Sequence, residues 1–444
     1  MTTLTVTSDR ATALRPTTPF GLGNVAHAPR DQRFAATPLA SAVVEALARR
    51  GLDSLRAHAT VAWEKPEQGL HTFGFGVAAR IEGARSSGMC DVHAAVAALR
   101  ARIEPESRHA LRLLGGGRFT PDSAIVDPAW TSFGGWQFVL PSLLLALTPT
   151  TATAVWVSDR GAPTEADIAA LFAGPADAPE APAPAAGALT PDAWCDAVAR
   201  SVAEIHAGRY EKSVLARRQI VETAATPGVI VTRLADRFPR CFIFKFSSGG
   251  ATWLGASPEL LVSLDAGRVN AASVAGSQRG CAGEGLTGDP KERAEHGFVV
   301  TALQTSLEPL CEALDFPAQP EVMRLPNISH LYTPFTGRPR AGVTILDLVE
   351  AVHPTPAVAG WPRAEAIEAI GRLEAMDRGW YAGPIGWLDL EGHGEFAVAL
   401  RSGLVEQGRA TLFAGAGIVG ASQPAEELAE TETKFGALRD AISG

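Results

Sequence analysis

The chain has 444 residues, of which 46% are hydrophobic and 20% charged, and its formal net charge is −9 at pH 7. A chain of this length and composition buries a large core, which excludes global disorder. Its acidic balance and its lack of any Lys/Arg cluster argue against a nucleic-acid partner.

Cysteine usage and hydrophobic runs indicate the compartment. The five cysteines are scattered and form no CxxC pair, which disfavours a disulfide framework or structural zinc and favours a reducing compartment. Residues 1–16 lack the apolar core of a signal peptide, and the run over 138–147 is too short to span a bilayer. We therefore expect a cytoplasmic protein with no membrane partner.

Short strands and helices are predicted over the first 173 residues, after a leader over 1–35 that has little periodicity. The run "RLLGGGRFTP" over 112–121 is predicted to be a glycine-rich turn, and it lacks the GxxxxGK[ST] pattern of a phosphate-binding loop. The other expected elements are helices over 38–50 and 91–103, strands over 58–64, 71–83, 132–148 and 151–159, and a helix after Thr164.

Residues 174–190 are rich in Ala and Pro and lack bulky apolar side chains, so we expect a mobile connection there. It separates an N-terminal part over 1–173 from a second part over 191–444. The composition fits either a surface loop inside one fold or a boundary between domains.

The second part alternates strands with longer helices. The strand expected over 268–280 closes on Gly276 and Ser277, small residues that allow a ligand close to the backbone. The other expected elements are a helix from Thr190 to Gly208, strands over 209–221, 241–248 and 251–267, a helix from Asp289, and a last strand and helix within 412–442.

Two ionisable residues in this part occur at strand boundaries. Lys212 enters a predicted strand just before an apolar pair, and Glu259 follows a Ser-Pro step inside an apolar stretch. Lys212 fits either a solvated edge residue or a base whose pKa is lowered at the mouth of a sheet. Glu259 fits either a turn cap or a general acid whose pKa rises in a partly apolar pocket.

Two helices prolong a core-facing stripe with paired carboxylates. A solvated charged face is the simple interpretation of each. The alternative is a hard cation held by few carboxylates and several waters, which is how proteins usually bind Mg²⁺. The stripes contain Glu292, Glu295 and Val299 on the first helix, and Glu427, Glu430, Lys434 and Leu438 on the last.

Eight motifs, in order, resemble those of chorismate-utilising enzymes, the family of isochorismate, salicylate, aminodeoxychorismate and anthranilate synthases. The motifs are "EKSVLARR", "GASPELL", "VAGSQRG", "KERAEH", "SHLYTPFTG", "VHPTPAVAG", "YAGPIGW" and "FAGAGIVGASQPAEELAETETK". The resemblance is dense from Thr190 to the C-terminus. The earlier runs "LLGGGRF" and "WQFVLPS" are similar to the N-terminal half of isochorismate synthases.

The resemblance implies an α+β fold with two sub-lobes, each a large, mostly antiparallel sheet flanked by helices, and an active site between them. It implies Mg²⁺ on Glu295 and Glu430, with Glu292 and Glu427 bound through water. It also implies contacts with the two carboxylates and the ring of chorismate. Those substrate-binding residues are Gly276, Ser277 (where the family often has threonine), His330, Ala357, Tyr381, Arg401, Gly415 and Lys434.

Without the resemblance, His330 fits a structural histidine and Arg401 a cation on a strand surface. Within the family, members that add ammonia generally lack the lysine at the position of Lys212 and act with a glutamine amidotransferase. The resemblance therefore implies water as the nucleophile, no amidotransferase partner and, as in many relatives, a monomer.

By the same resemblance, Lys212 deprotonates a water that attacks C2 of chorismate and Glu259 protonates the departing C4 hydroxyl, which makes the chain an isochorismate synthase. One alternative is a salicylate synthase, which also expels pyruvate. Another is a chorismate-binding protein without turnover. The pathway served by the product, whether menaquinone, catechol siderophore or salicylate, stays open.

Overall fold

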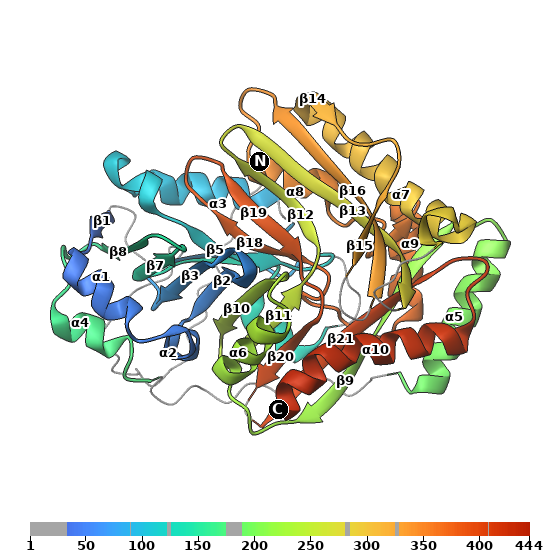
Figure 1. Ribbon diagram of the computed structural model, residues 1–444, viewed down its shortest axis with the longest axis horizontal. Helices are drawn as coiled ribbons and strands as arrows, with labels where there is room; N and C mark the ends of the chain where they lie inside the picture. The colour runs from blue at the N-terminus through green and yellow to red at the C-terminus, as the bar shows by residue number, and fades with distance from the viewer. Residues whose placement is uncertain are drawn as a thin grey trace.

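Two large antiparallel sheets organise the molecule (Figure 1). The computed structural model describes residues 33–88, 90–121, 126–174, 189–279, 285–324, 328–406 and 408–444. The predicted leader over 1–35 and the predicted connection over 174–190 therefore lie almost entirely outside the described residues. The predicted α+β fold with two large sheets is confirmed.

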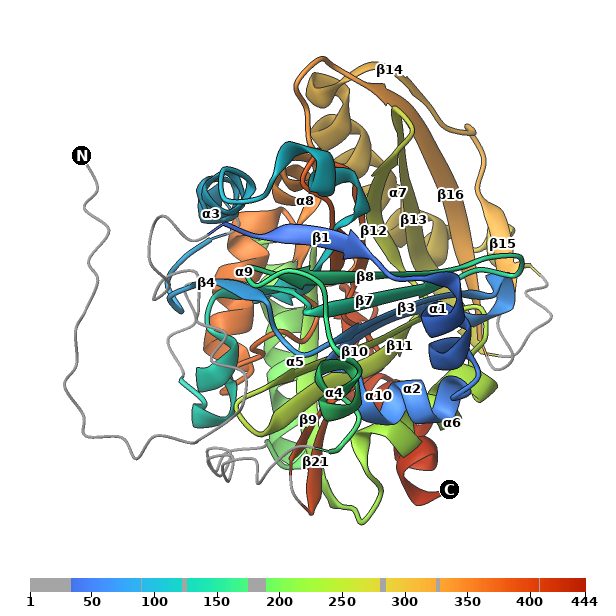
Figure 2. The same ribbon diagram turned by 90° about the vertical axis from the view of Figure 1, so that its left-hand side faces the viewer.

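The eleven-stranded sheet has the order β1-β8-β7-β3-β2-β10-β11-β20-β21-β9-β17. Figure 2 shows β1, β8, β7 and β3 one below another. Its strands are β1 Ala35–Pro38, β2 Val61–Lys65, β3 Leu70–Phe75, β7 Leu143–Leu147, β8 Ala152–Ser158, β9 Lys212–Glu222, β10 Phe242–Ser248, β11 Ala251–Ser257, β17 Gly360–Trp361, β20 Ser402–Glu406 and β21 Arg409–Ile418.

The ten-stranded sheet has the order β14-β16-β13-β12-β19-β18-β5-β6-β4, with β15 paired to β16. Its strands are β4 Ala79–Gly83, β5 Leu113–Gly117, β6 Trp136–Leu140, β12 Leu260–Asp265, β13 Arg268–Arg279, β14 Cys311–Asp315, β15 Glu321–Arg324, β16 Ile328–Pro339, β18 Pro384–Leu388 and β19 Gly394–Val398. Both sheets contain strands from before and after the predicted connection.

Helices pack against the faces of both sheets (Figure 1). Helix α7 packs on β13 and β16, and α10 packs on β21. The α-helices are α1 Ser41–Ala48, α2 Leu52–His58, α3 Cys90–Arg100, α4 Glu165–Ala170, α5 Pro191–His206, α6 Pro227–Arg237, α7 Pro290–Leu307, α8 Ile345–Val352, α9 Arg363–Leu373 and α10 Pro424–Ser443. Short 3-10 helices are η1 Pro66–Gln68, η2 Pro105–Ala110, η3 Pro128–Phe133, η4 Leu286–Gly288 and η5 Glu308–Leu310.

The glycine-rich run predicted as a turn is instead the buried strand β5, which lies between β18 and β6. A Cβ on Gly115 would lie 2.0 Å from the carbonyl oxygen of Gln137, and one on Gly116 would lie 2.3 Å from that of Pro384. The glycines are therefore explained by close approach of neighbouring backbones, a requirement that the sequence pattern alone does not separate from a turn.

An aromatic cluster supports the centre of the molecule. The rings of Trp130 and Trp253 are 5.0 Å apart, and Phe413 of β21 packs against both. Tyr381 stacks on Phe413 with ring centroids 5.3 Å apart. Because aromatic side chains bury large apolar areas with defined geometry, the cluster fixes Tyr381 and β21 relative to each other.

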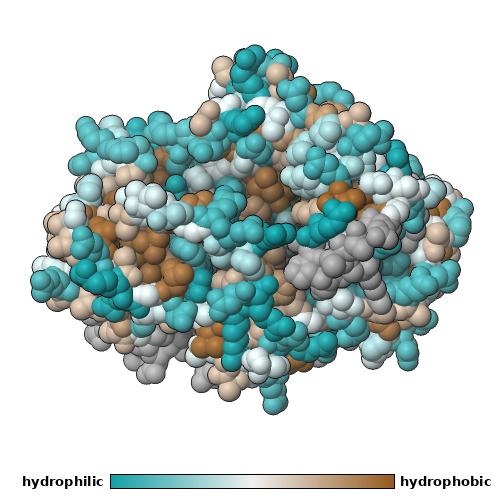
Figure 3. Space-filling view, viewed as in Figure 1, coloured by the Kyte–Doolittle hydropathy of each residue, from teal (hydrophilic) through white to brown (hydrophobic). Residues whose placement is uncertain are grey.

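The surface face in Figure 3 is mostly hydrophilic, and hydrophobic residues appear in recesses, including a hollow near the middle of the face. Within the described residues, none of the helices combines the length and the apolar character that crossing a bilayer requires.

Candidate active site

The candidate site lies at two of the points where the chain passes from one sheet to the other. Between β11 and β12 it crosses at Pro258 and Glu259, and between β19 and β20 at Ala399 to Arg401. The crossings are hydrogen-bonded to each other, because Val398 N donates to Glu259 O at 3.1 Å and Ala256 N to Arg401 O at 3.2 Å. Arg401 has φ +48°, a backbone conformation that is sparsely populated and often found at functional sites.

A pocket opens at these crossings and brings together side chains from both sheets and from helices α7 and α10. Eight of the predicted site residues line it: Glu259, Glu295, His330, Ala357, Arg401, Gly415, Glu430 and Lys434. Seven further lining residues were not among the predicted site residues: Val214, Pro258, Val274, Ala275, Val358, Leu400 and Gly417.

Lys212 lies beside the pocket and is fully buried, which excludes the solvated-edge interpretation. It begins β9, which is covered on one edge by β21 and on the other by Trp361 of β17. Its Nζ donates to Glu295 Oε1 at 2.7 Å. A Cβ on Gly417 would lie 2.9 Å from that oxygen and 3.2 Å from Lys212 Cε, so the glycine leaves room for the pair.

Glu259 is buried, with 6% of its surface exposed. Burial raises its pKa to about 7, against the opposing effect of the nearby charges of Lys212, Arg401 and Lys434. A carboxyl group with this pKa holds a proton near neutral pH, as a general acid requires. Glu259 lines the same pocket as Glu295, which is the residue that accepts a hydrogen bond from Lys212.

The two acidic helix faces reach the pocket from different helices, α7 and α10. Glu295 of α7 and Glu430 of α10 both line it, and each carboxylate contacts a lysine. Lys434 Nζ lies 2.5 Å from Glu430 Oε1 and also donates to Gly415 O at 2.8 Å. Glu295 and Glu430 therefore border one pocket, each with a lysine as its partner.

This donor set fits a Mg²⁺ ion held by few protein oxygens. Across the described residues, no group of three or more His, Cys, Asp and Glu side chains is gathered as a metal cage. Mg²⁺ is usually bound by one or two carboxylates plus waters and substrate oxygens, and not by an all-protein cage. Glu427, one turn before Glu430, is 5% exposed, and Glu292, one turn before Glu295, is partly buried.

Gly276 stands at a bulge in β13, where the register with β16 shifts between Ala275 and Ser277. Its φ is +75°, and a Cβ there would lie 2.7 Å from Glu292 O, so this position requires glycine. The bulge packs against the first turn of α7. The backbone of Ser277 pairs with His330, whereas its side chain lies outside the described atoms.

Two of the residues predicted to contact the ring, His330 and Tyr381, are buried and uncharged near neutral pH, and the third, Ala357, is partly buried. Burial, together with the nearby charges of Arg401 and Lys434, lowers the pKa of His330 to about 3. Burial raises the pKa of Tyr381 to about 12. Tyr381 borders the site without lining the pocket, and its hydroxyl oxygen lies 3.4 Å from where a Cβ on Gly415 would stand. Both side chains therefore act as neutral hydrogen-bonding groups.

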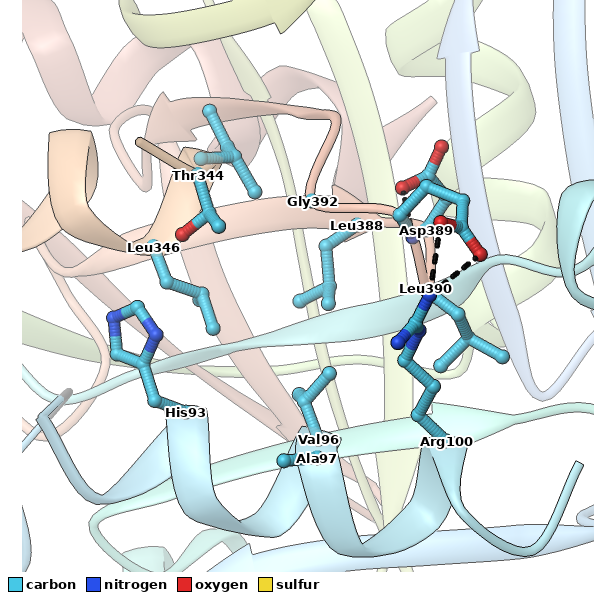
Figure 4. Close-up of a pocket in the computed structure, with 12 residues that line it drawn as sticks. His93, Val96, Ala97, Arg100, Thr344, Leu346, Leu388, Asp389, Leu390 and Gly392 are labelled. Carbon is cyan, nitrogen blue, oxygen red and sulfur yellow. Dashed lines mark hydrogen bonds and ion pairs between the residues drawn. The ribbon is translucent and has the colours of Figure 1, made fainter. Parts of the chain in front are cut away.

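A second hollow lies between α3, the start of α8 and the turn from β18 to β19 (Figure 4). It contains none of the predicted site residues. Arg100 at its rim is paired with Glu391 at 3.0 Å, and His93 lies 3.6 Å from Asp347. Arg100 and Glu391, which both line this hollow, are therefore ion-paired with each other.

A family model described as chorismate binding enzyme matches residues 43–443. The chain belongs to this family. It is 36% identical over 404 residues to the salicylate biosynthesis isochorismate synthase of Pseudomonas aeruginosa. This match covers 86% of this chain and 84% of the relative. It is 35% identical over 353 residues to isochorismate synthase MenF of Bacillus subtilis, with 75% and 74% covered.

Solved structures of the family have the same fold. A putative 2,3-dihydroxybenzoate-specific isochorismate synthase, DhbC from Bacillus anthracis, matches with a TM-score of 0.69 at 25% identity over 89% of this chain and 99% of its own. The menaquinone-specific isochorismate synthase MenF from Escherichia coli matches with a TM-score of 0.74 at 24% identity over 92% and 94%. The predicted family and fold are both confirmed.

Proposed function

We propose that this protein is an isochorismate synthase, an isomerase that converts chorismate to isochorismate by adding water at C2 and expelling the C4 hydroxyl. The observation that supports this proposal most strongly is that two buried ionisable residues meet at one pocket. Glu259 lines the pocket, and Lys212 lies beside it. The names of the two relatives described above support the same activity. The chemistry needs one group that removes a proton and one that donates a proton, and this pair supplies both.

In the proposed reaction, the neutral amine of Lys212 takes a proton from a water molecule as its oxygen bonds to C2. The ring double bonds shift, the C4–O bond breaks, and Glu259 gives its proton to the departing oxygen, which leaves as water. One water enters and one leaves, so substrate and product are isomers. Lys212 ends protonated and Glu259 ionised, and exchange of one proton through solvent resets the pair.

Cations at the pocket wall fit the two carboxylates of chorismate. We assign Arg401, Lys434 and the backbones of Gly276, Ser277 and Gly415 to them. His330, Ala357 and Tyr381 would border the ring. A carboxylate held by several donors at once is fixed in position as well as neutralised, which aligns C2 and C4 with their catalytic groups.

Glu295 and Glu430 would hold Mg²⁺ directly, with Glu292 and Glu427 bound through water. When bound, the ion would neutralise and orient a substrate carboxylate. The same Glu295 carboxylate accepts from Lys212 Nζ at 2.7 Å, so the ion would lie close to the proposed base.

We further propose that the chain acts in the cytoplasm as a monomer, without a glutamine amidotransferase. Without an amidotransferase, no ammonia is supplied to compete with water as the nucleophile. A lyase reaction on the same scaffold would release pyruvate from the product, so pyruvate distinguishes a salicylate synthase from the proposed isomerase.

The test is turnover of chorismate by the purified protein with Mg²⁺ in water enriched in ¹⁸O. We expect isochorismate that carries ¹⁸O at C2, with no pyruvate. Unlabelled product would contradict the attack of solvent water. Stoichiometric pyruvate and salicylate would replace the isomerase with the lyase, and unchanged chorismate would support a binding protein.

A further inference from the structure

The edge of β9 beside the pocket is completed by side chains instead of a strand. β17 pairs with β9 only at Lys212 and Ser213, and Ala359 O then accepts from Val214 N at 2.9 Å. Beyond this point Arg378 Nη2 donates to Val214 O at 2.6 Å, and Ala216 N donates to Glu374 Oε1 at 2.7 Å. Because buried backbone groups need partners, these two side chains take over the role of a neighbouring strand.

Glu374 and Arg378 also bind each other, and we call them the edge pair. Arg378 Nε donates to Glu374 Oε2 at 2.9 Å, and Nη2 also contacts Oε1. Their side chains are 4% and 2% exposed for Arg378 and Glu374, and the guanidinium lies 4.2 Å from the ring centroid of Phe119. The planar fork of arginine makes such simultaneous bonds possible, whereas lysine offers one point charge.

The local chain conformation brings the two residues together. Glu374 caps the C-terminal end of α9, and Ala375 adopts φ +50°, which turns the chain sharply after the helix. Arg378 follows within the next turn and faces back toward Glu374. This geometry holds the edge pair against β9 from an element that does not itself line the pocket.

The edge pair joins two walls of the pocket. Arg378 Nη1 donates to Val358 O at 3.0 Å while Nη2 holds Val214 O. Val214 and Val358 both line the pocket and come from segments far apart in the chain. Lys212 stands two residues before Val214 on the same strand, so the bond that fixes Val214 also fixes the strand that carries Lys212.

We propose that Glu374 and Arg378 are positioning residues, which set the separation of β9 from the segment at Val358 and thereby the alignment of Lys212 with the ring. The inference rests on the proposed function. We expect the edge pair to affect turnover without contacting the substrate. A misplacement of about 1 Å at a catalytic group lowers rate by roughly 10²-fold, so the expected effect is large.

The matched comparison uses Arg378→Lys and Arg56→Lys. Arg56 forms a similarly buried pair with Glu64, with side chains 4% and 0% exposed, and neither residue lines the pocket. We expect both variants to lower the midpoint of thermal unfolding. Below both midpoints, Arg378→Lys lowers kcat by about 10²-fold with the dissociation constant of chorismate unchanged, whereas Arg56→Lys retains the wild-type kcat.

Glu374→Gln is the second variant, which decides the question if Arg378→Lys does not fold. It keeps the shape and an acceptor for Ala216 N–H but removes the charge that holds Arg378. We expect a smaller fall in kcat, again without a change in chorismate binding. Equal kcat values for the folded edge-pair variant and Arg56→Lys would overturn the inference, as would a loss confined to chorismate binding.

Chorismate consumption and product identity are measured separately in these assays. A wild-type protein that consumes chorismate but forms another product overturns the proposed function and leaves the rate comparison valid for the edge pair. A wild-type protein that leaves chorismate unchanged overturns both.

Discussion

Two charge clusters in this protein differ in what their charges face. In the N-terminal part, Glu64 accepts from Arg56 Nε at 3.1 Å and from Arg56 Nη2 at 3.0 Å, and His71 Nδ1 lies 2.6 Å from the same carboxylate. None of these residues lines the pocket at the crossings. We call it the closed cluster, because its charged groups contact one another and Asp53, and none of them faces the pocket.

In the second cluster, Glu295 and Glu430 each contact a lysine and also face the pocket. Glu259 shares that pocket with its pKa raised to about 7 by burial. Burial of charge therefore does not by itself mark a catalytic site. A better indication is a set of charged side chains that line a pocket, where a ligand can form further hydrogen bonds or ion pairs with them.

The largest effect on turnover is expected from Lys212→Ala, compared with Lys245→Ala. Lys245 is also buried, but it donates to Arg56 O at 2.8 Å and lies outside the pocket. Removal of this proposed base should lower kcat by up to about 10⁴-fold with chorismate binding largely intact. Steady-state kinetics and a binding titration measure the two properties. A Lys212→Ala enzyme with normal kcat would remove Lys212 from the mechanism.

Glu259→Gln should lower kcat by about 10³-fold, since the amide cannot give up a proton to the C4 oxygen. In the wild type, turnover should fall as the pH rises above about 7, because Glu259 then ionises. The variant should lack this alkaline limb in its pH–rate profile. A limb that persists unchanged in Glu259→Gln would mean that another group supplies the proton.

The same substitution makes a prediction about stability. The pKa of Glu259 is about 7 in the folded protein, against an ordinary value of 4.5, so folding takes up a proton between these pH values. The stability contributed by the protonated form is therefore complete below about pH 4.5 and is lost as the pH rises through about 7. At pH 8, Glu259→Gln should unfold at a higher temperature than the wild type, as measured by calorimetry.

A smaller effect is expected from Glu427→Gln, which tests the four-glutamate metal proposal. An outer carboxylate of a metal site typically contributes about 10–100-fold in metal affinity. Calorimetric titration with Mg²⁺, with and without isochorismate, measures it. Glu432→Gln on the same helix is the control, since Glu432 pairs with Arg217 and Arg439 outside the pocket. Equal affinities in the two variants would exclude Glu427 from the metal site.

The smallest effect on turnover is expected from Glu64→Gln in the closed cluster. It removes the buried counter-charge of Arg56 and leaves only the exposed Asp53 at 3.5 Å, which should lower the free energy of unfolding by about 3 kcal/mol. Urea unfolding measures this loss. The kcat of the folded variant should equal that of the wild type, and a fall in kcat would break the distinction between the two clusters.

Much of the pocket could be predicted because its residues belong to local patterns. The stripe on α10 already placed Glu427 and Glu430 on the face of Leu438, which is 2% exposed, and the motif order linked both to Lys434. The sequence also predicted most strands that carry site residues. Alternation and apolar runs are local properties that survive into the fold.

Other features depend on contacts that no local pattern contains. Glu374 and Arg378 have the i, i+4 spacing of an ordinary surface ion pair, and only tertiary packing makes them buried partners of β9. The run at Gly115 fits a turn as well as a strand, because a turn and a close backbone approach both favour glycine. Lys212 likewise required the pairing of β9 on both edges to be recognised as buried.

The strand order has a consequence for biosynthesis. β2 pairs with β10, with Val61 opposite Phe246, and β5 pairs with β18, with Leu113 opposite Leu388. A nascent chain therefore exposes two unpaired strand edges until much later segments leave the ribosome. We expect a fragment spanning 33–174, expressed alone, to self-associate through those edges, and co-expression with the remaining chain to suppress the aggregation.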